Sequence, residues 1–217
     1  MPQTEQSFST SVSQSVGLRY LLYLPPHYDS VTTWPLIIFL HGLGERGDDL
    51  NLVAKHGLPK RIADGTHFPF IVASPQCPDT TYWPEQVTAL NALLDHLIET
   101  QKVDTTRIYL TGLSMGGYGT YFFASQFPQR FAAIAPICGG GGWWMPGRLA
   151  QIPMWVFHGE ADETVPVIES TRMVEGIQKA GGDVKLTIYP GLGHNSWTQT
   201  YENPELYNWF LSHRLKA

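Results

Sequence analysis

The sequence predicts an α/β protein with a mostly parallel sheet that carries helices on both faces. Six short apolar runs lack the alternation of a half-exposed strand, which indicates strands covered on both sides. They span residues 35–40, 70–73, 107–111, 131–137, 154–157 and 184–189. Helical patterns lie between several of them, and glycine-rich or polar loops follow four of them. Strands that alternate with helices are typical of a doubly wound sheet, whose ligands bind at the carboxyl ends of the strands.

Spacing of apolar residues identifies the helices. The clearest pattern has three- and four-residue intervals on one helix face, at Val87, Leu90, Leu93, Leu94, Leu97 and Ile98. Further helices are expected over residues 118–127, around Met173 to Ile177, and from Pro204, a residue type that suits the first helical position. Residues 8–24 alternate and are rich in β-branched and aromatic side chains, so segment 1–24 is expected to hold one or two edge strands.

Length and composition favour a single domain over residues 1–217. The chain is 43% hydrophobic and 15% charged, which suffices for one buried core. Its net charge is −5, with no Lys/Arg cluster, so neither a nucleic-acid nor a membrane partner is expected. The first residues lack the features of a secretory signal, which makes the cytoplasm the default compartment; export would need a leader ahead of this sequence. The sequence does not predict the oligomeric state.

No cofactor or metal ion is expected from the motifs. The glycine run 139–142 is not followed by the Gly-Lys-Ser/Thr of a phosphate loop, and neither an HExxH nor a paired-cysteine motif occurs. Two cysteines, Cys77 and Cys138, are too few for a disulfide scaffold. Two free, buried thiols are the simpler interpretation, and one bridge stays an alternative for an exported protein.

Four strand ends are expected to deliver polar or glycine-rich loops to the same sheet edge. These loops are residues 41–44 (His-Gly-Leu-Gly), 112–117 (Gly-Leu-Ser-Met-Gly-Gly), 158–162 (His-Gly-Glu-Ala-Asp) and 190–194 (Pro-Gly-Leu-Gly-His). Because parallel strands share one carboxyl edge, the loops should meet and form a site.

Ser114 is the candidate nucleophile of that site. The pattern Gly112-x-Ser114-x-Gly116 directly after an apolar strand is the signature of a nucleophile elbow. The serine occupies a sharp strand-to-helix turn, so the residues two before and two after it must lack side chains. The helix that follows directs its unpaired N–H groups toward the place where negative charge develops.

His194 and Asp162 are the candidate base and orienting acid. A serine hydroxyl needs a base that a third group orients, and both residues follow strands in the chain order expected for this elbow. Glu160 and Glu163 are weaker alternatives to Asp162, whose short side chain backbone hydrogen bonds can fix on a turn. The other histidines have no comparable context: His41 and His158 should brace loops, whereas surface or helix positions are expected for His27, His56, His67, His96 and His213.

An oxyanion hole is expected from two backbone N–H groups, those of Met115 and Leu43. Four tryptophans lie on loops expected near the same edge: Trp83, Trp143, Trp144 and Trp197. Either they form an aromatic wall that binds an aryl group of the substrate or they pack the rim, and the sequence leaves both alternatives open.

From about Tyr20 onward the chain resembles bacterial esterases of the α/β-hydrolase superfamily, a "predicted peptidase" group related to dienelactone hydrolases, feruloyl esterases and polyhydroxybutyrate depolymerases. The matching stretches are HGLGERGDD (41–49), KHGLPK (55–60), FIVASPQCP (70–78), RIYLTGLSMGGYGT (107–120), RFAAIAPICGGG (130–141), HGEADETVP (158–166) and GHNSW (193–197). The resemblance implies an α/β-hydrolase fold, with Asp162 at the acid position, His194 at the base position and Leu43 in the oxyanion loop.

The expected function is therefore a serine carboxylesterase that hydrolyses short-chain acyl or aryl esters, including cinnamoyl esters, through an acyl-enzyme intermediate. An alkoxide leaves more readily than an amine, so an ester is the easier substrate. The chain is near the minimum size for the fold, and no insertion is long enough for a lid domain, so the serine should face an open cleft. A peptidase or thioesterase is the alternative, and a catalytically silent binding protein is a third hypothesis.

Overall fold

A single seven-stranded sheet organises the computed structural model, which describes residues 3–215. The strand order is β1-β3-β2-β4-β5-β6-β7; β1 is antiparallel to β3, and the other neighbours are parallel. The strands are β1 (Tyr20–Tyr23), β2 (Trp34–Leu40), β3 (Ile71–Pro75), β4 (Val103–Leu113), β5 (Ala133–Ile137), β6 (Met154–Gly159) and β7 (Val184–Tyr189). The six predicted apolar runs correspond to β2–β7, and the predicted α/β fold class is confirmed.

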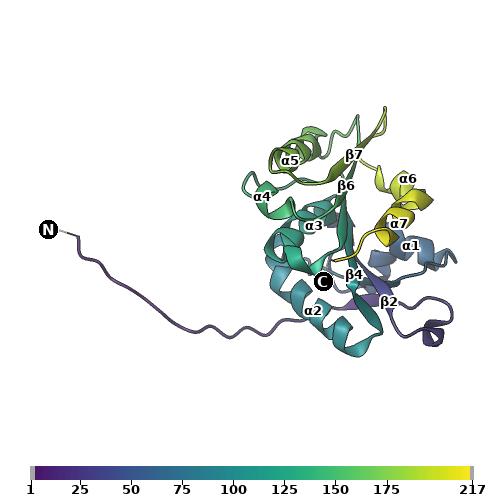
Figure 1. Ribbon diagram of the computed structural model, residues 1–217, viewed down its shortest axis with the longest axis horizontal. Helices are drawn as coiled ribbons and strands as arrows, with labels where there is room; N and C mark the ends of the chain where they lie inside the picture. Colours follow the sequence, from purple (N-terminus) through teal and green to yellow (C-terminus); the bar gives the residue numbers. More distant parts are fainter. Residues whose placement is uncertain (1–2, 216–217) are drawn as a thin grey trace.

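Helices cover both faces of this sheet (Figure 1). One face carries α2 (Val87–Thr100), α3 (Met115–Gln126), α4 (Pro146–Leu149) and α5 (Ile168–Lys179), and the other carries α1 (Gly57–Ala63), α6 (Trp197–Glu202) and α7 (Pro204–Leu211). Short 3-10 turns fill the connections: η1 (Tyr28–Ser30), η2 (Leu43–Glu45), η3 (Leu50–Lys55), η4 (Trp83–Gln86) and η5 (Pro128–Arg130). Among residues 3–215, no helix is long and apolar enough to cross a bilayer.

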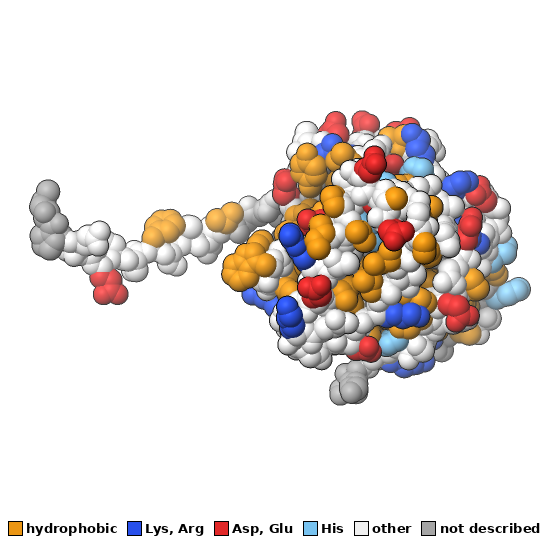
Figure 2. All heavy atoms as spheres, turned by 90° about the horizontal axis from the view of Figure 1, so that it is seen from above, with side chains coloured by type: hydrophobic (Ala, Val, Ile, Leu, Met, Phe, Trp, Pro, Cys, Tyr) orange, Lys and Arg blue, Asp and Glu red, His pale blue; other side chains and the backbone are white. Residues whose placement is uncertain are grey.

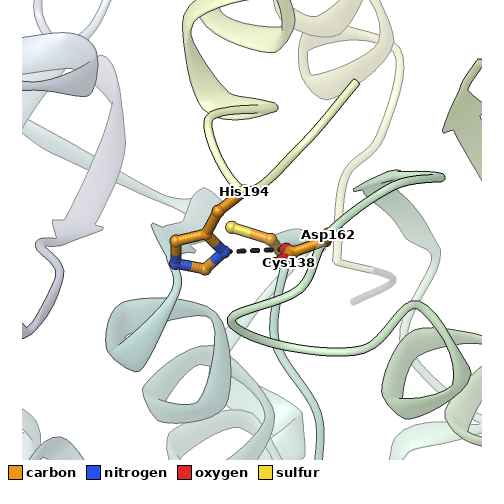
Figure 3. Close-up of side chains that lie close together, drawn as sticks. All are labelled: Cys138, Asp162 and His194. Atoms are coloured by element: carbon orange, nitrogen blue, oxygen red, sulfur yellow. Dashed lines mark hydrogen bonds and ion pairs between the residues drawn. The ribbon is translucent and has the colours of Figure 1, made fainter. Parts of the chain in front are cut away.

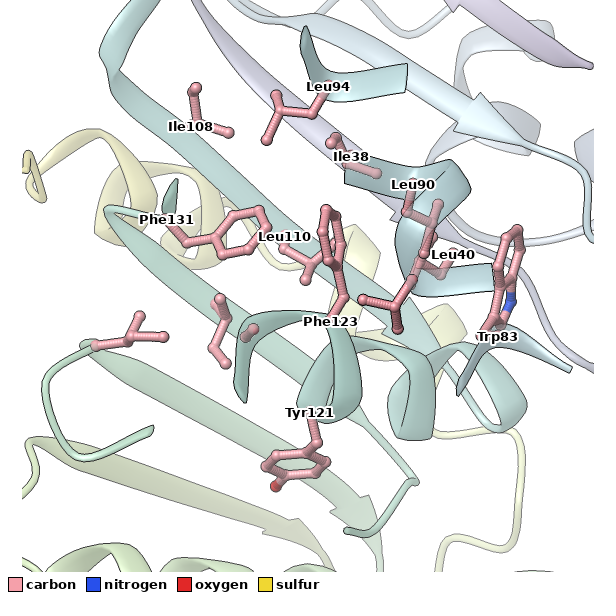
Figure 4. Close-up of a cluster of buried hydrophobic side chains, with 14 of the residues drawn as sticks. Ile38, Leu40, Trp83, Leu90, Leu94, Ile108, Leu110, Tyr121, Phe123 and Phe131 are labelled. Carbon is pink, nitrogen blue, oxygen red and sulfur yellow. The ribbon is translucent and has the colours of Figure 1, made fainter. Parts of the chain in front are cut away.

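Two apolar cores, one on each face, explain why the strand sequences do not alternate. Along β2, Leu36, Ile38 and Leu40 join the core beneath α2, α3 and α5, whereas Ile37 and Phe39 join the core beneath α1, α6 and α7. All five side chains are fully buried. Complete burial of one such side chain stabilises the fold by about 1.5–3 kcal/mol. Figure 4 shows the first core, where Phe123 and Tyr121 of α3 lie against the strands.

The N-terminal segment differs from the prediction, because only one edge strand forms. β1 pairs with β3 over four residues, from Tyr20 opposite Pro75 to Tyr23 opposite Val72. Residues 3–17 are exposed, form no strand and extend away from the body (Figures 1 and 2), and residues 1–2 lie outside the described residues. The reason is composition: Phe8 and Val12, 89% and 86% exposed, are separated only by Ser and Thr residues, so a second strand could bury too little apolar surface to offset its ordering entropy.

Candidate active site

The turn between β4 and α3 holds Ser114 in a backbone conformation that L-residues rarely adopt. Its φ and ψ are 55° and −117°. The glycines on either side make the turn possible: a Cβ on Gly112 would overlap the carbonyl of Gly116, and a Cβ on Gly116 would overlap the carbonyl of Leu40. The Ser114 amide donates to the Ile137 carbonyl at 3.0 Å, which ties the turn to β5. Strain of this kind is sustained where the surrounding structure fixes the backbone and the position serves a function.

Ser114, His194 and Asp162 form one chain of hydrogen bonds. The Ser114 Oγ lies 2.9 Å from His194 Nε2, and His194 Nδ1 lies 2.7 Å from Asp162 Oδ2. These residues come from three loops, after β4, β7 and β6, that the parallel sheet brings to one edge. Figure 3 shows the second contact, with the imidazole plane directed at the carboxylate. An ionised carboxylate only accepts, so the Nδ1 carries the hydrogen and the Nε2 is left to accept from the serine.

The turn after β6 fixes the Asp162 side chain from the opposite direction. Its Oδ1 accepts two backbone hydrogen bonds, from the amides of Thr164 and Val165, each at 2.9 Å. The residue is 6% exposed, and its carboxylate is therefore held in one orientation. Glu160 instead accepts from the Gly191 amide at 2.9 Å, and Glu163 is exposed. Neither glutamate forms a hydrogen bond or ion pair with His194 in the described part of the chain.

His41 and His158 brace loops, as predicted from the sequence. The Nδ1 of His41 donates to the Gly42 carbonyl at 2.6 Å, and its Nε2 accepts from the Cys77 amide at 3.0 Å. Trp83 adds a third tie, because its Nε1 donates to the His41 carbonyl at 2.9 Å. His158 lies beside Asp162, with 3.2 Å between Nε2 and Oδ2.

Leu43 and Met115, the two predicted oxyanion donors, each follow the carboxyl end of a strand. Leu43 begins η2 after β2, and Met115 begins α3 after β4, and these two strands are neighbours in the sheet. The Leu43 side chain is 51% exposed, so the loop stands at the surface beside the serine turn. The first amides of a helix have no carbonyl acceptor within that helix. The N–H groups at the start of α3 are therefore free to bind negative charge.

Of the four candidate substrate-binding tryptophans, one lies against the hydrogen-bonded trio. The ring of Trp197 meets that of His194 edge-on, with 5.2 Å between centroids. Trp83 is the clearest error: it is completely buried between α3 and the His41 loop, so it packs the core and cannot touch a ligand there.

Trp144 lies away from the start of α3, and Trp143 is largely exposed. Trp143 is 88% exposed and Trp144 57%, and they pack edge-on against each other at 5.9 Å. Trp144 lines a hollow with Phe122 and Gln126 of α3. At 1.5 Å per residue, that part of the helix lies about 10 Å or more from its first residue.

Cys138 is a neighbour of the trio that the sequence did not identify. Its sulfur, a carboxylate oxygen of Asp162 and a ring nitrogen of His194 all lie within 4.8 Å of one another (Figure 3). The residue follows β5 with φ 39°, and its burial raises the pKa of the thiol to about 12, so the sulfur stays protonated. Cys77 is also free and buried, which decides the question of a disulfide in favour of two thiols.

His56 lies at the start of α1 with a partly exposed side chain, as predicted, but its neighbour was not foreseen. It precedes α1, and its ring meets Trp197 edge-on at 5.6 Å, so it lies one aromatic ring away from His194. No spacing rule connects His56 with the 193–197 loop, because α1 and α6 are brought together only by packing on the same sheet face.

A family model described as phospholipase/carboxylesterase matches residues 67–205, a range that contains Ser114, Asp162 and His194. The chain belongs to this family. Its α/β-hydrolase fold is confirmed by a thermostable esterase known from its crystal structure, which is 35% identical with a TM-score of 0.80 over 91% of this chain and 59% of that one. The sheet and its helices occupy the described chain without a separate lid domain.

Several curated relatives are esterases by name. A bifunctional acetylxylan esterase/xylanase XynS20E of Neocallimastix patriciarum is 28% identical over 76% of this chain and 24% of its own length. A probable feruloyl esterase C of Aspergillus niger is 26% identical over 89% of this chain and 73% of its own length. The chain thus spans about a quarter of the first protein and somewhat more than half of the crystallised esterase. The resemblance to the feruloyl esterase and dienelactone hydrolase relatives is confirmed.

The buried His41 should make stability depend on pH. Burial lowers its pKa to about 4, and the adjacent Gly42 carbonyl opposes this only in part. As pH falls from about 6.5 to about 4, the unfolded chain binds a proton that the folded chain does not, so stability is lost, by about 3 kcal/mol. In His41→Gln, whose amide oxygen can still accept from the Cys77 amide, the free energy of unfolding should no longer fall by this amount. Urea unfolding at pH 7 and pH 4.5 measures it.

The matched control for this prediction is His67→Gln, at an exposed position. It should show the same decline between the two pH values as the unsubstituted protein. If His41→Gln also shows the full decline, the acid sensitivity does not come from His41.

Proposed function

We propose that this chain hydrolyses carboxylic esters, with Ser114 as nucleophile, His194 as general base and Asp162 as the group that orients the base. The observation that carries the proposal is the continuous chain Ser114–His194–Asp162, with hydrogen-bond distances of 2.9 and 2.7 Å, at a strained turn. Ester substrates are supported by the names of the relatives, which include acetylxylan and feruloyl esterases.

The reaction follows from the positions of these atoms. The Ser114 Oγ attacks the ester carbonyl carbon while its proton passes to His194 Nε2, and Asp162 stabilises the resulting imidazolium. The amides of Met115 and Leu43 donate to the oxyanion that forms. The tetrahedral intermediate collapses, the C–O bond to the alcohol breaks, and His194 returns its proton to the leaving alcohol. Water then attacks the acyl-serine by the same route and releases the acid.

Short acyl or aryl esters are the substrate class that we propose. The Leu43 side chain is half exposed and His194 is part-buried, so the serine turn opens to the surface. Trp197 beside His194 offers an aromatic contact for a planar group, worth about 0.5–1.5 kcal/mol beyond its burial. A fold relative from Butyrivibrio proteoclasticus, Est1E, has been solved with ferulic acid bound, at 16% identity and a TM-score of 0.66. Peptide hydrolysis is the less favoured alternative, because an amine leaves less readily than an alkoxide.

Ester turnover should depend on the Ser114 hydroxyl. Ser114→Ala should lower kcat for p-nitrophenyl acetate and methyl ferulate by at least about 10⁴-fold, because the members of such a trio act as a unit. The chromogenic peptide in the same panel should be cleaved far more slowly than either ester by the unsubstituted protein. A Ser114→Ala protein that is folded and keeps a tenth of the activity would exclude Ser114 as the nucleophile.

The acid should be Asp162 and not its neighbour. Asp162→Asn should lower kcat by about 10⁴-fold, since the imidazole loses the carboxylate that fixes its tautomer. Glu160→Gln is the matched control, two residues away, because a glutamine oxygen can still accept from Gly191. Its kcat should fall by less than about tenfold, and Glu163→Gln should behave alike. Steady-state kinetics on one ester ranks the three variants, and a larger loss in either glutamate variant would move the acid.

A further inference from the structure

A pocket of about 280 Å³ opens between α1 and α6, beside the loop that carries His194. Residues just before and within α1 line one part of it, namely Lys55, His56, Lys60 and Arg61. Asn195 and Trp197, which directly follow the His194 position, line another part. The proposed reaction so far uses none of the cationic residues.

Two buried N–H groups of this pocket lack an acceptor. Neither Arg61 Nε nor Trp197 Nε1 has a hydrogen-bond partner among the described residues. The other buried side-chain atoms without a partner in residues 3–215 are oxygens, on Glu45, Gln76, Asn91, Tyr121 and Ser196. Among residues 3–215, both buried side-chain nitrogens without a partner thus belong to residues that line this pocket. A buried donor left unpaired costs about 1–3 kcal/mol.

The charge of the pocket favours a negatively charged ligand. Lys55, Lys60 and Arg61 lie within seven residues of a chain whose net charge is −5. Lys60 is paired with Asp64 at 2.6 Å, but Lys55 and Arg61 form no ion pair in the part of the chain that the structure describes. Glu202 is the remaining acid in the lining, so the pocket keeps a net positive charge. Hydrogen bonds from charged donors to an anion are roughly twice as strong as neutral ones.

The position of the pocket assigns it to the alcohol half of an ester. Trp197 lies between it and the base, with 5.2 Å from the Trp197 ring to the His194 ring and 5.6 Å to that of His56. In the proposed mechanism His194 returns its proton to the leaving alcohol, so the alcohol departs on the side of the imidazole. A substituent of that alcohol is the part of the substrate nearest Trp197.

We propose that this pocket binds an anionic oxygen group, a carboxylate or a phosphate, carried by the alcohol half of the substrate. The inference rests on the proposed ester hydrolysis and narrows its substrate class. The Arg61 guanidinium donates to the anion, and Lys55 and Lys60 supply charge. The anion contributes binding and orientation and takes no part in bond making or breaking.

Matched acetate esters test the preference. The first pair is 4-acetoxybenzoate and its neutral amide. The second pair is 3-(4-acetoxyphenyl)propanoate and its amide, in which the carboxylate or amide lies farther from the ester group. Each kcat/KM is first divided by the rate constant for hydrolysis of the same ester by hydroxide. In at least one pair, the resulting value for the carboxylate should be about tenfold above that for its amide, mainly because KM is lower. This ratio should fall toward one in Lys55→Gln/Arg61→Gln and in high salt. Lys179→Gln, an exposed cation on α5, should keep it.

Each contrary outcome separates the two proposals. Hydrolysis of the amides without any preference for the carboxylates would overturn the anion pocket and leave ester hydrolysis intact. A preference for an acyl-side carboxylate, tested with mono-p-nitrophenyl glutarate against p-nitrophenyl butyrate, would overturn the assignment to the alcohol half. If no ester is hydrolysed, calorimetric titration of Ser114→Ala with 4-acetoxybenzoate and its amide still decides, since equal or absent binding overturns the pocket. Inhibition by benzoate against phenyl phosphate identifies the preferred anion.

An independent observation concerns His158, whose side chain is completely buried at the end of β6. Its Nε2 lies 2.8 Å from the Val165 carbonyl and 3.2 Å from Asp162 Oδ2. Both oxygens can only accept, so the Nε2 must carry a hydrogen, which it shares between them. Its Nδ1 lies 2.7 Å from Ser170 Oγ, which fixes the ring from the other side.

The same carboxylate oxygen accepts from both histidines, because Oδ2 of Asp162 also receives the His194 Nδ1 hydrogen at 2.7 Å. We infer that His158 is a positioning residue that fixes the carboxylate of Asp162 and, through it, the His194 ring. This inference also rests on the proposed function. Without this donor the carboxylate can rotate about its two backbone contacts, and small misplacements of a catalytic group cost up to about 100-fold in rate.

Two amide substitutions separate positioning from packing. His158→Gln places an N–H near the Nε2 position, whereas His158→Asn reaches only the Ser170 side. The asparagine variant should lose about 10- to 100-fold in kcat with KM within about twofold, and the glutamine variant should recover most of it. The low-field proton resonance of the His194 Nδ1–H should shift in His158→Asn and return toward its original position in His158→Gln. Equal kcat in the two folded variants, or a resonance that neither moves, would overturn the role.

Discussion

The close approach of α3 to the carboxyl ends of β2 and β4 is the contact on which the site depends. Gly116 touches the Leu40 carbonyl, and Gly117 and Gly119 bring the helix against the Ile137 carbonyl and Trp83. With no Cβ in the way, the helix begins directly above the sheet, and the turn before it must take the strained conformation seen at Ser114. The position of the serine hydroxyl is thus set by backbone packing, which side-chain motion cannot relax.

Hydrogen bonds from buried polar side chains hold the loops around the Ser114 turn in addition to this backbone packing. His41, His158 and Asp162 are nearly or completely buried, and the side chain of each forms hydrogen bonds with backbone or side-chain groups. Buried polar groups are costly unless they are paired, so these residues hold the loops after β2 and β6 in one arrangement. The buried, protonated Cys138 thiol fills the space beside Asp162 and His194 without adding charge.

The surface near the site divides into two chemically different parts. Toward α1 and α6 it is cationic, and Trp197 lies between this part and His194. Trp143 and Trp144 lie on the α4–α5 side, where they pack on each other, and Trp144 lines a hollow with residues of α3.

The sequence alone determined the strand order along the chain, the elbow at Ser114 and the three residues that form the hydrogen-bonded trio. These features follow from local patterns: continuous apolar runs, paired glycines, and polar residues directly after strands. Tertiary structure decided what local patterns cannot express. Trp83 was expected at the rim but lies in the core, Phe8 and Val12 were expected in an edge strand but find no partner, and His56 lies against Trp197 although 141 residues separate them. The physical reason is that the direction and burial of a side chain on a loop depend on which elements pack above it, and this is fixed only when the helices settle on the two faces of the sheet.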